Sequence, residues 1–588
     1  MIEARFDDLT GAEPSFRLVE PVGVLEATDL AEVPGVLAAA DAASIRGLWV
    51  AGFVAYEAAP GLDPALAVRP RTGGGPSAEV PLAWFGMFEG RQETALPDPP
   101  EDAPTGGDGA AWAASVDRAA YDEAIDRIRE RIAAGDTYQV NHTLRLHATV
   151  QGDPRGLYRD LCHAQRGAYG AYLDTGRHRV LSASPELFFR IDGETISTKP
   201  MKGTAPRGRW LAEDLERRDR LQASEKDRAE NAMIVDLLRN DIGRVAREGS
   251  VTWSDVFEAE RYETVWQLTS TVSATLVAGA TMPEIFRALF PCGSVTGAPK
   301  VATTRIIADL EDAPRGVYCG TVGYLAPPTG PGPRARFNVA IRTAVQDAGS
   351  GLTAYGVGGG ITWDSSAGAE YDEAVAKARV LTERRPSFRL VETMIAPAGE
   401  PVRHLDRHLA RLLGSATYFG FTADEAAIRA AVADVDDPAR TLRLRLVLDR
   451  RGHVEVAAAT APVHPDTVTV AIDEAASVDP ADVFLFHKTT VRRVYDEALD
   501  RHDTAQDVVL TNLRGEVTES TIANVAARIG DRWYTPPVDA GLLPGVGRAV
   551  ALDEGRITER SLTVAELRAA DEVALVSDNR GWRRATLV

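Results

Sequence analysis

The order of short helical and strand patterns constrains the fold of this chain most strongly. Ile125, Ile128 and Ile132 lie on one helical face, which predicts an amphipathic helix. Residues 143–150 then alternate polar and apolar side chains, which predicts a strand with one buried face. The dipeptide Asp192-Gly193 separates two further strand-like runs and predicts a hairpin. Because these patterns do not repeat in a strand–helix–strand rhythm, we predict an α+β fold.

Two breaks in composition divide the chain of 588 residues. Residues 96–109 are rich in Pro, Gly and acidic residues, which is typical of a loop or linker. A shorter break at 382–386 follows a long helical pattern and precedes a new strand. We therefore predict a first domain over 1–383, with an N-terminal part over 1–110 and a core over 117–381, and a second domain over 386–588.

Charge and hydropathy exclude several function classes. The chain has 85 Asp and Glu against 65 Lys and Arg, and its net charge of −20 argues against a nucleic-acid or anionic-membrane binder. No run approaches the ~18 apolar residues of a membrane span, and the acidic N-terminus lacks the apolar region of a signal peptide. Three cysteines without metal-binding spacing favour a reducing cytoplasm.

Two segments carry carboxylates at helical spacing. Asp227 and Glu230 are three residues apart in the first, and Glu370, Glu373 and Lys377 share a face in the second. If the fold brings the two acidic faces together, they form an oxygen cage that suits Mg²⁺. Two solvated helix faces are the more common outcome for such charges, so spacing alone leaves both alternatives open.

Three loops contain residues that suit ligand chemistry. Lys199 and Lys202 lie in TKPMKGTAPRG, where desolvation would make a lysine nucleophilic, although surface lysines are more common. PCGSVTGAPK lacks the spacing of a phosphate loop, but Pro299 favours a helix start, so 296–298 would form its N-terminal anion site. GVGGG at 356–360 indicates backbone in close contact with a ligand or another strand.

Together and in this order, these segments resemble the chorismate-utilising enzymes, the family of anthranilate, aminodeoxychorismate, isochorismate and salicylate synthases. The resemblance spans about residues 119–381 and is carried by GDTYQVN, SPELFFR, STKPMKGTAPRG, ENAMIVDLLRNDIGRV, GSVTGAPK and GVGGGITWDSSAGAEYDEAVAKA. It implies an antiparallel α+β sandwich with the active site between its sheets, and residues 1–110 would complete that sandwich.

Three positions favour one activity within this family. Gln139 stands where isochorismate and salicylate synthases carry the lysine that activates water, so water attack is not expected. Lys202 stands where anthranilate synthases carry alanine, and the resemblance implies that it attacks C2 of chorismate so that ammonia enters at C4. Gln267 replaces a catalytic histidine of anthranilate synthases. The expected product is 4-amino-4-deoxychorismate.

The resemblance also implies roles for the other candidate residues. Glu186 would be the general acid/base that helps to expel the C4 hydroxyl. Mg²⁺ would lie on the substrate carboxylate, held by Glu230 and Glu373 with support from Asp227 and Glu370. The substrate-binding residues would be Arg342, Tyr318, Gly358, Gly359, Lys377, Thr296 and Gln139.

Ammonia is expected from a separate glutamine amidotransferase subunit, or from solution. An amidotransferase module needs a nucleophilic cysteine in a glycine elbow, and neither Cys162 nor Cys292 has that context.

From about residue 387 to 588 the chain resembles the fold-type IV pyridoxal-phosphate (PLP) enzymes, which include branched-chain and D-amino-acid aminotransferases and aminodeoxychorismate lyase. The resemblance is carried by HLDRHLARLLGSA, FHKTTVRRVYDEAL, LTNLRGEVTESTIANVAARI and GLLPGVGRAVAL. It implies that Lys488 bonds covalently to PLP and shuttles protons, while Glu519 pairs with the pyridine nitrogen. The other cofactor-binding residues would be Asn524, which supports Glu519, and Arg411, Val546 and Gly547, which contact the phosphate.

The first domain indicates the substrate of the second. An aminodeoxychorismate lyase would convert the expected product into 4-aminobenzoate and pyruvate, so we predict a bifunctional enzyme with Mg²⁺ and PLP as cofactors. Two alternatives remain for the second domain, an aminotransferase and a fold-type IV domain without catalysis. A homodimer through this domain is also expected, because fold-type IV enzymes usually dimerise.

Overall fold

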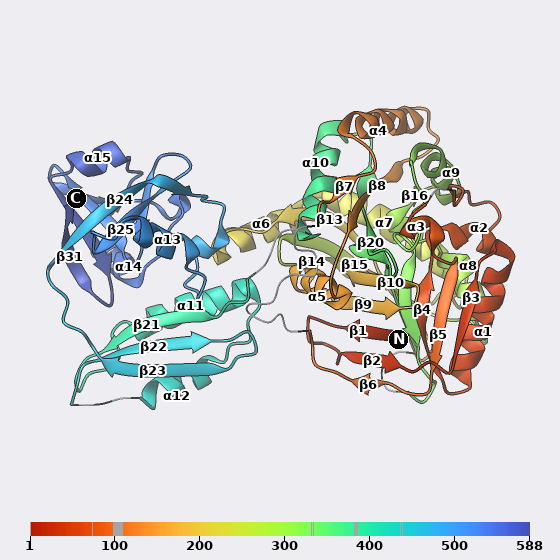
Figure 1. Cartoon of the computed structure of the whole chain (residues 1–588), viewed down its shortest axis with the longest axis horizontal. Coiled ribbons are helices and arrows are strands. Elements are labelled where there is room, and N and C mark those ends of the chain that lie inside the picture. The colour runs from red at the N-terminus through yellow and green to blue at the C-terminus, as the bar shows by residue number, and fades with distance from the viewer. Residues whose placement is uncertain are drawn as a thin grey trace. The chain divides into compact units, whose positions relative to one another are not determined.

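A computed structural model describes residues 2–72, 74–97, 110–330, 332, 334–381, 386–435, 437 and 439–588. The chain divides into two compact units (Figure 1), Met1–Pro206 with Arg218–Arg385 and Arg207–Arg217 with Pro386–Val588. The composition breaks at 96–109 and 382–386 lie almost entirely outside the described residues. Among the described residues, no helix is long and apolar enough to cross a membrane.

Two antiparallel sheets form the first unit. The spatial order of one is β16 (Gly297–Ala298), β8 (Gln139–Thr149), β20 (Leu352–Ile361), β19 (Thr343–Asp347), β10 (His178–Ser184), β9 (Tyr169–Asp174), β1 (Glu3–Asp7), β2 (Phe16–Val19) and β6 (Gln92–Glu93), and β7 (Ala113–Ala114) pairs with β8. The order of the other is β13 (Met201–Pro206), β15 (Val265–Thr275), β12 (Thr195–Lys199), β11 (Leu187–Asp192), β18 (Ala335–Val339), β17 (Thr321–Leu325), β4 (Trp49–Val54), β5 (Ala83–Phe88) and β3 (Gly23–Ala27), and β14 (Thr252–Arg261) pairs with β15.

The two sheets share an inner core and carry helices on their outer faces. Phe6 of β1 and Tyr324 of β17 belong to one buried cluster, with ring centroids 5.0 Å apart. The helices over the β8 sheet are α4 (Arg118–Ala133), α5 (Pro154–Gln165), α9 (Lys300–Leu310) and α10 (Ala367–Ala378). Those over the other sheet are α1 (Val33–Ile45), α7 (Glu225–Gly243) and α8 (Met282–Leu289), and the shorter α2 (Ala59–Leu62) and α3 (Pro76–Glu79) complete the unit. The predicted α+β antiparallel sandwich is confirmed.

Local sequence signals account for several elements of this sandwich. Asp117 caps α4 by accepting a hydrogen bond from the amide of Ala120, and Ile125 and Ile128 are fully buried on its inner face. The predicted hairpin joins β11 to β12, and Gly193 takes the positive φ of 56° that the turn requires. Spacing and turn chemistry therefore placed both elements.

Strand β8 differs from its expectation of one buried face. Thr143 and Arg145, on its polar side, are only 1% exposed. Arg145 pairs with Glu311 at 3.2 Å, and Arg315 pairs with the same carboxylate at 2.6 Å. These ion pairs satisfy polar side chains away from water. The alternation in sequence therefore marks two buried faces of different chemistry.

The second unit combines a small sheet with a larger mixed one. The small sheet has the order β21 (Leu390–Ala396), β22 (Leu442–Leu448) and β23 (Val454–Thr460), and it packs with α11 (Leu405–Phe419) and α12 (Glu425–Ala433). The larger sheet has the order β26 (Val517–Ser520), β25 (Asp507–Asn512), β24 (Thr467–Val478), β31 (Gly581–Leu587), β30 (Glu572–Ser577), β27 (Asn524–Ile529), β28 (Arg532–Thr535) and β29 (Thr558–Glu559). Its helices are α13 (Arg493–Arg501), α14 (Val546–Asp553) and α15 (Val564–Ala569). Leu409 and Leu412 are buried on α11, three positions apart on one face of the helix.

One short segment departs from the predicted continuous first domain. Arg207–Arg217, which includes the start of α6 (Leu211–Ala223), belongs to the second unit. There the Tyr418 hydroxyl donates to the Gly208 carbonyl at 2.7 Å, and the rings of Trp210 and Phe486 lie 5.2 Å apart. No local sequence pattern predicts that this segment belongs to the second unit, because its aromatic partners lie more than two hundred positions later in the chain.

Candidate active sites

The first unit contains a cavity of about 340 Å³ that collects most of the predicted site residues. They come from strands β13 and β20, helices α7 and α10 and the loops between strands, so the fold gathers positions far apart in sequence. The predicted residues on the wall are Glu186, Lys202, Asp227, Glu230, Tyr318, Arg342, Gly358, Gly359, Glu370, Glu373 and Lys377.

The glycines of β20 allow side chains to approach its backbone. A Cβ at Gly360 would lie 2.9 Å from Nζ of Lys202 and 2.6 Å from Nε2 of Gln139. A Cβ at Gly359 would lie 3.2 Å from Oε2 of Glu370. The predicted close backbone contact of GVGGG is confirmed, and it places Gln139 beside Lys202.

Glu186 is a buried acid on the cavity wall. Burial raises the pKa of its carboxyl group to about 7, although a hydrogen bond with Ser294 and the charge of Lys202 oppose this shift. Its Oε1 atom is buried without a hydrogen-bond partner in the described part of the chain. A carboxyl group that is half-protonated near neutrality can donate a proton to a leaving group.

Two lysines neutralise the acidic side of the cavity. Nζ of Lys202 lies 3.5 Å from Oε2 of Glu230, and Nζ of Lys377 lies 2.7 Å from Oε1 of Glu373. Burial opposes ionisation of Glu373, but Lys377 outweighs it and lowers its pKa. Burial raises the pKa of the neighbouring Glu370.

The four carboxylates suit Mg²⁺ by their chemistry, since this ion prefers oxygen ligands. Within the described residues, however, no three of Asp227, Glu230, Glu370 and Glu373 offer oxygens within 4.8 Å of one another. The acidic faces of α7 and α10 therefore line one cavity, and Lys202 and Lys377 each pair with one of the carboxylates.

Arg342 reaches the cavity from a strained backbone position. Its φ of 52° is unusual for a residue with a side chain. Its Nη1 donates to the carbonyl of Lys377 at 2.6 Å, and Nζ of Lys377 donates to the carbonyl of Gly358 at 2.9 Å. These bonds hold the cationic side chains of Arg342 and Lys377 on the cavity wall, which suits an anionic ligand.

The structure does not bring Thr296 to the cavity wall. Its hydroxyl donates to the carbonyl of Cys292 at 3.1 Å. Helix α9 begins at Lys300 with Pro299 as its N-cap, and Gly297–Ala298 pair with β8 as strand β16. The expected anion site at 296–298 is therefore wrong, because sheet pairing uses that backbone.

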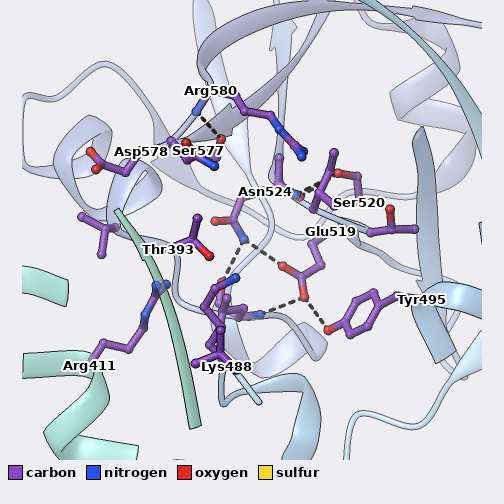
Figure 2. Close-up of a pocket in the computed structure, with 18 of the residues that line it drawn as sticks. Thr393, Arg411, Lys488, Tyr495, Glu519, Ser520, Asn524, Ser577, Asp578 and Arg580 are labelled. Carbon is purple, nitrogen blue, oxygen red and sulfur yellow. Dashed lines mark hydrogen bonds between the residues drawn. The ribbon is translucent and has the colours of Figure 1, made fainter. Parts of the chain in front are cut away.

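The second unit contains a cavity of about 370 Å³ around Lys488 (Figure 2). The predicted cofactor residues on its wall are Arg411, Lys488, Glu519, Asn524 and Val546, whereas Gly547 is not among the residues described there. Burial and the nearby Arg411 lower the pKa of the Lys488 amine to about 8. A lysine with a lowered pKa has a larger neutral fraction, which can react with an aldehyde.

Glu519 is held by three donors in this cavity (Figure 2). The Tyr495 hydroxyl and the Leu543 amide donate to its Oε1 at 2.8 and 3.1 Å, and Nδ2 of Asn524 donates to its Oε2 at 3.3 Å. Burial raises the pKa of Glu519 to about 7 despite these bonds. A carboxylate fixed in this way suits the protonated nitrogen of a pyridine ring, so the residues present fit PLP.

Sequence reasoning missed several residues on this wall. Arg443 and Arg445 point to the cavity side of β22, opposite the buried Leu444. The alternation in LRLRL could have shown that the two arginines share one face. Tyr495 and Arg580 carry no comparable local signal, because the fold alone brings them to Lys488.

Comparisons with known proteins agree with this division. The family described as chorismate binding enzyme matches residues 10–383, and the family described as amino-transferase class IV matches residues 389–588.

Individual relatives resemble the first unit. Aminodeoxychorismate synthase of Streptomyces griseus is 43% identical over 291 residues, which cover 49% of this chain and 39% of that protein. Aminodeoxychorismate synthase component 1 of Escherichia coli (strain K12) is 40% identical over 266 residues, which cover 45% of this chain and 57% of that protein. The matched part thus spans about half the length of these relatives or less.

A solved structure shows the same fold. Anthranilate synthase component I from Streptococcus pneumoniae TIGR4 aligns with a TM-score of 0.54 and 25% identity, over 63% of this chain and 93% of that one. The matches, the sandwich and the cavity between α7, α10 and β20 agree: the chain belongs to the family of chorismate binding enzymes and carries a class IV aminotransferase domain after it.

Proposed function

We propose that this chain makes 4-aminobenzoate in two steps. The first cavity would aminate chorismate to 4-amino-4-deoxychorismate, and the second would release pyruvate from that product. The observation that carries the first step is the position of Lys202, which lies on the cavity wall beside Gln139 and Gly360. A lysine amine is a nucleophile, whereas glutamine cannot activate water as a base, so this pair supports amination over hydration.

The side chains of the first cavity could carry out the amination by covalent catalysis. After losing its ammonium proton to water, Lys202 would add through its amine to C2 of chorismate, the ring double bond would shift, and the C4–O bond would break. Glu186 would give its proton to the departing hydroxyl, which leaves as water. Ammonia would then add at C4, and the reverse shift would break the bond from C2 to Lys202.

Charged groups would orient the substrate during this exchange. Arg342 and Lys377 would bind its carboxylates. Glu230 and Glu373, supported by Asp227 and Glu370, would hold Mg²⁺, which would neutralise carboxylate charge. The ammonia would come from a separate glutamine amidotransferase, as the relatives called component 1 suggest by their name.

In the second cavity, Lys488 would hold PLP and move protons. Bound PLP supplies an electron sink next to the substrate nitrogen. Glu519 would keep its pyridine nitrogen protonated, and Arg411 would bind its phosphate. Lys488 would remove the proton at C4 of the substrate, and loss of pyruvate would leave an aromatic ring.

The match to the class IV aminotransferases favours one alternative, in which the second cavity transfers an amino group. Purified protein given chorismate, ammonium, Mg²⁺ and PLP should form 4-aminobenzoate and pyruvate in equal amounts. Anthranilate as the product would contradict the first step. Amino transfer from an amino acid to a 2-oxo acid, without pyruvate release, would establish the alternative for the second.

Glu186 should set the pH dependence of the first step. Its protonated form is the active acid, and burial raises its pKa to about 7, so chorismate consumption at low substrate should fall as pH rises above about 7. The measurement keeps the concentration of free ammonia constant across pH. Glu186→Gln should lower the rate by ~10²-fold or more and remove this alkaline decline. A decline that persists in the variant would assign it to another group.

Gly547→Ala should weaken PLP binding by ~10-fold or more. A Cβ at this position would lie 2.5 Å from the carbonyl carbon of Ser577 and 2.6 Å from the amide nitrogen of Asp578, so the helix start and the loop must separate. Gly414→Ala on α11 is the matched control, because its Cβ would meet only Leu211 at 3.7 Å. Titration of the apoprotein with PLP measures both, and equal affinities would contradict the prediction.

A further inference from the structure

A chain of side chains connects the expected phosphate-binding arginine to the loop after β30. Nε and Nη2 of Arg411 donate to the two oxygens of Glu392 at 2.8 and 2.7 Å. Oε2 of Glu392 also bonds to Nδ1 of His408 at 2.8 Å. Nε2 of His408 reaches Oδ2 of Asp578 at 3.1 Å, and Nδ1 of His404 bonds to its Oδ1 at 2.6 Å. Arg411 and Asp578 lie on the same side of the cavity in Figure 2.

Because the network is buried, its stability depends on whether His408 is charged. Glu392 and His408 are 1% exposed and Asp578 is 9% exposed, so the two carboxylates flanking His408 have little water to solvate them. A histidine can donate to a carboxylate from each ring nitrogen only in its charged form. Burial disfavours that form, but the bonds to Asp578 and Glu392 outweigh it and raise the pKa of His408. A charged His408, together with the bond from His404, then compensates the charge of Asp578, to which Arg411 donates no hydrogen bond in the described structure.

The network joins three segments that would surround a phosphate. Arg411 lies on α11, and its Nη1 donates to the carbonyl of Pro544, just before α14, at 3.3 Å. Asp578 follows β30, where Gly547 of α14 packs without room for a Cβ. The bonds of Arg411 use three of the five N–H groups of a guanidinium, so an N–H remains on each terminal nitrogen in the described structure for an anion.

We propose that His408 and Asp578 are positioning residues for the cofactor phosphate. His408, bonded to Glu392 on one side and to Asp578 on the other, holds Arg411 and the loop after β30 in the one arrangement that binds the phosphate. Neither residue touches the reacting atoms. The inference rests on the proposed PLP site and adds to it the residues that orient its anion-binding end.

The test compares two ligands that differ only in the phosphate, PLP and pyridoxal. His408→Gln cannot donate to both carboxylates, so its dissociation constant for PLP should rise ~10-fold or more, while that for pyridoxal changes less than ~3-fold. Asp578→Asn keeps the shape of the side chain and should show the same selective loss. Because the two residues act through one bond, the double variant should lose little more than the larger single loss.

Arg407→Gln is the control on the same helix. Arg407 pairs with Asp553 at 2.7 Å and is 45% exposed, so its removal should leave both affinities unchanged. Equal weakening of PLP and pyridoxal in His408→Gln and Asp578→Asn would overturn the proposal, because a general loss of structure would not discriminate between ligands. Unchanged PLP affinity in both would also overturn it. If the parent protein bound no PLP, the proposed cofactor itself would fail, and this inference with it.

Discussion

Lys202→Ala is expected to lower the formation of 4-amino-4-deoxychorismate by ~10³-fold or more, because it removes the proposed nucleophile. The side chain is 20% exposed, and its amine lies 3.5 Å from Glu230 on the cavity wall. Without the lysine, C2 of chorismate is open to ammonia, so residual amination is expected there. Chromatography of the products from chorismate and ammonium separates the two outcomes.

Lys199→Ala provides the matched control for this variant. Lys199 lies three positions earlier in the same segment, but its amine pairs with Glu260 and, at 3.5 Å, with Glu258, and it is not among the residues described on the cavity wall. Its removal should leave the rate within ~3-fold, because these ion pairs lie outside the described cavity wall and partly exposed pairs contribute little. Equal losses in the two lysine variants would show that Lys202 acts through the structure of the segment, which would contradict a covalent role.

Lys488→Ala is expected to stop 4-aminobenzoate formation by ~10³-fold or more and to let 4-amino-4-deoxychorismate accumulate. Burial lowers the pKa of this amine to about 8, and Glu519 and Arg411 share its cavity. Lys488 is also the only lysine in residues 386–588. Reduction of the PLP complex with borohydride, followed by peptide mass analysis, should therefore find the cofactor on this residue, and modification of any other lysine would contradict the proposed site.

Lys202→Ala and Lys488→Ala together test whether the two reactions occur at separate sites. Lys202→Ala should make neither product, whereas Lys488→Ala should make the intermediate, so a mixture of the two proteins should restore 4-aminobenzoate through diffusion. If both variants fail at the same step, or the mixture stays inactive while each protein is folded, the model of two separate sites is wrong.

Much of the fold could be predicted from sequence, because its signals are local. Helix α4 follows from the spacing of its isoleucines, the β11–β12 hairpin from Asp192-Gly193, and the close approach to β20 from its glycines. Lys202, Glu186 and Lys488 stand in motifs of adjoining residues, and the structure places all three on cavity walls. These features depend on contacts within a few positions, which periodicity and turn chemistry report directly.

The rest depends on partners that only the fold supplies. The alternation in sequence predicts that Thr143 faces solvent, but the residue is buried. Its hydroxyl can be buried because it donates a hydrogen bond to Glu311, which is distant in the sequence. Thr296 looked like part of an anion site but bonds inward, because β16 joins the sheet.

The sequence by itself indicated the family and the division into two parts, and it named the candidate reactive side chains. Only the tertiary structure decided which other side chains surround and orient the binding residues. His408 lies in the motif HLDRHLARLLGSA, but its link to Asp578 and Arg411 exists because β21, α11 and the loop after β30 converge. The residue type determines which reactions a side chain can perform, whereas neighbours that are distant in the chain determine its charge and orientation.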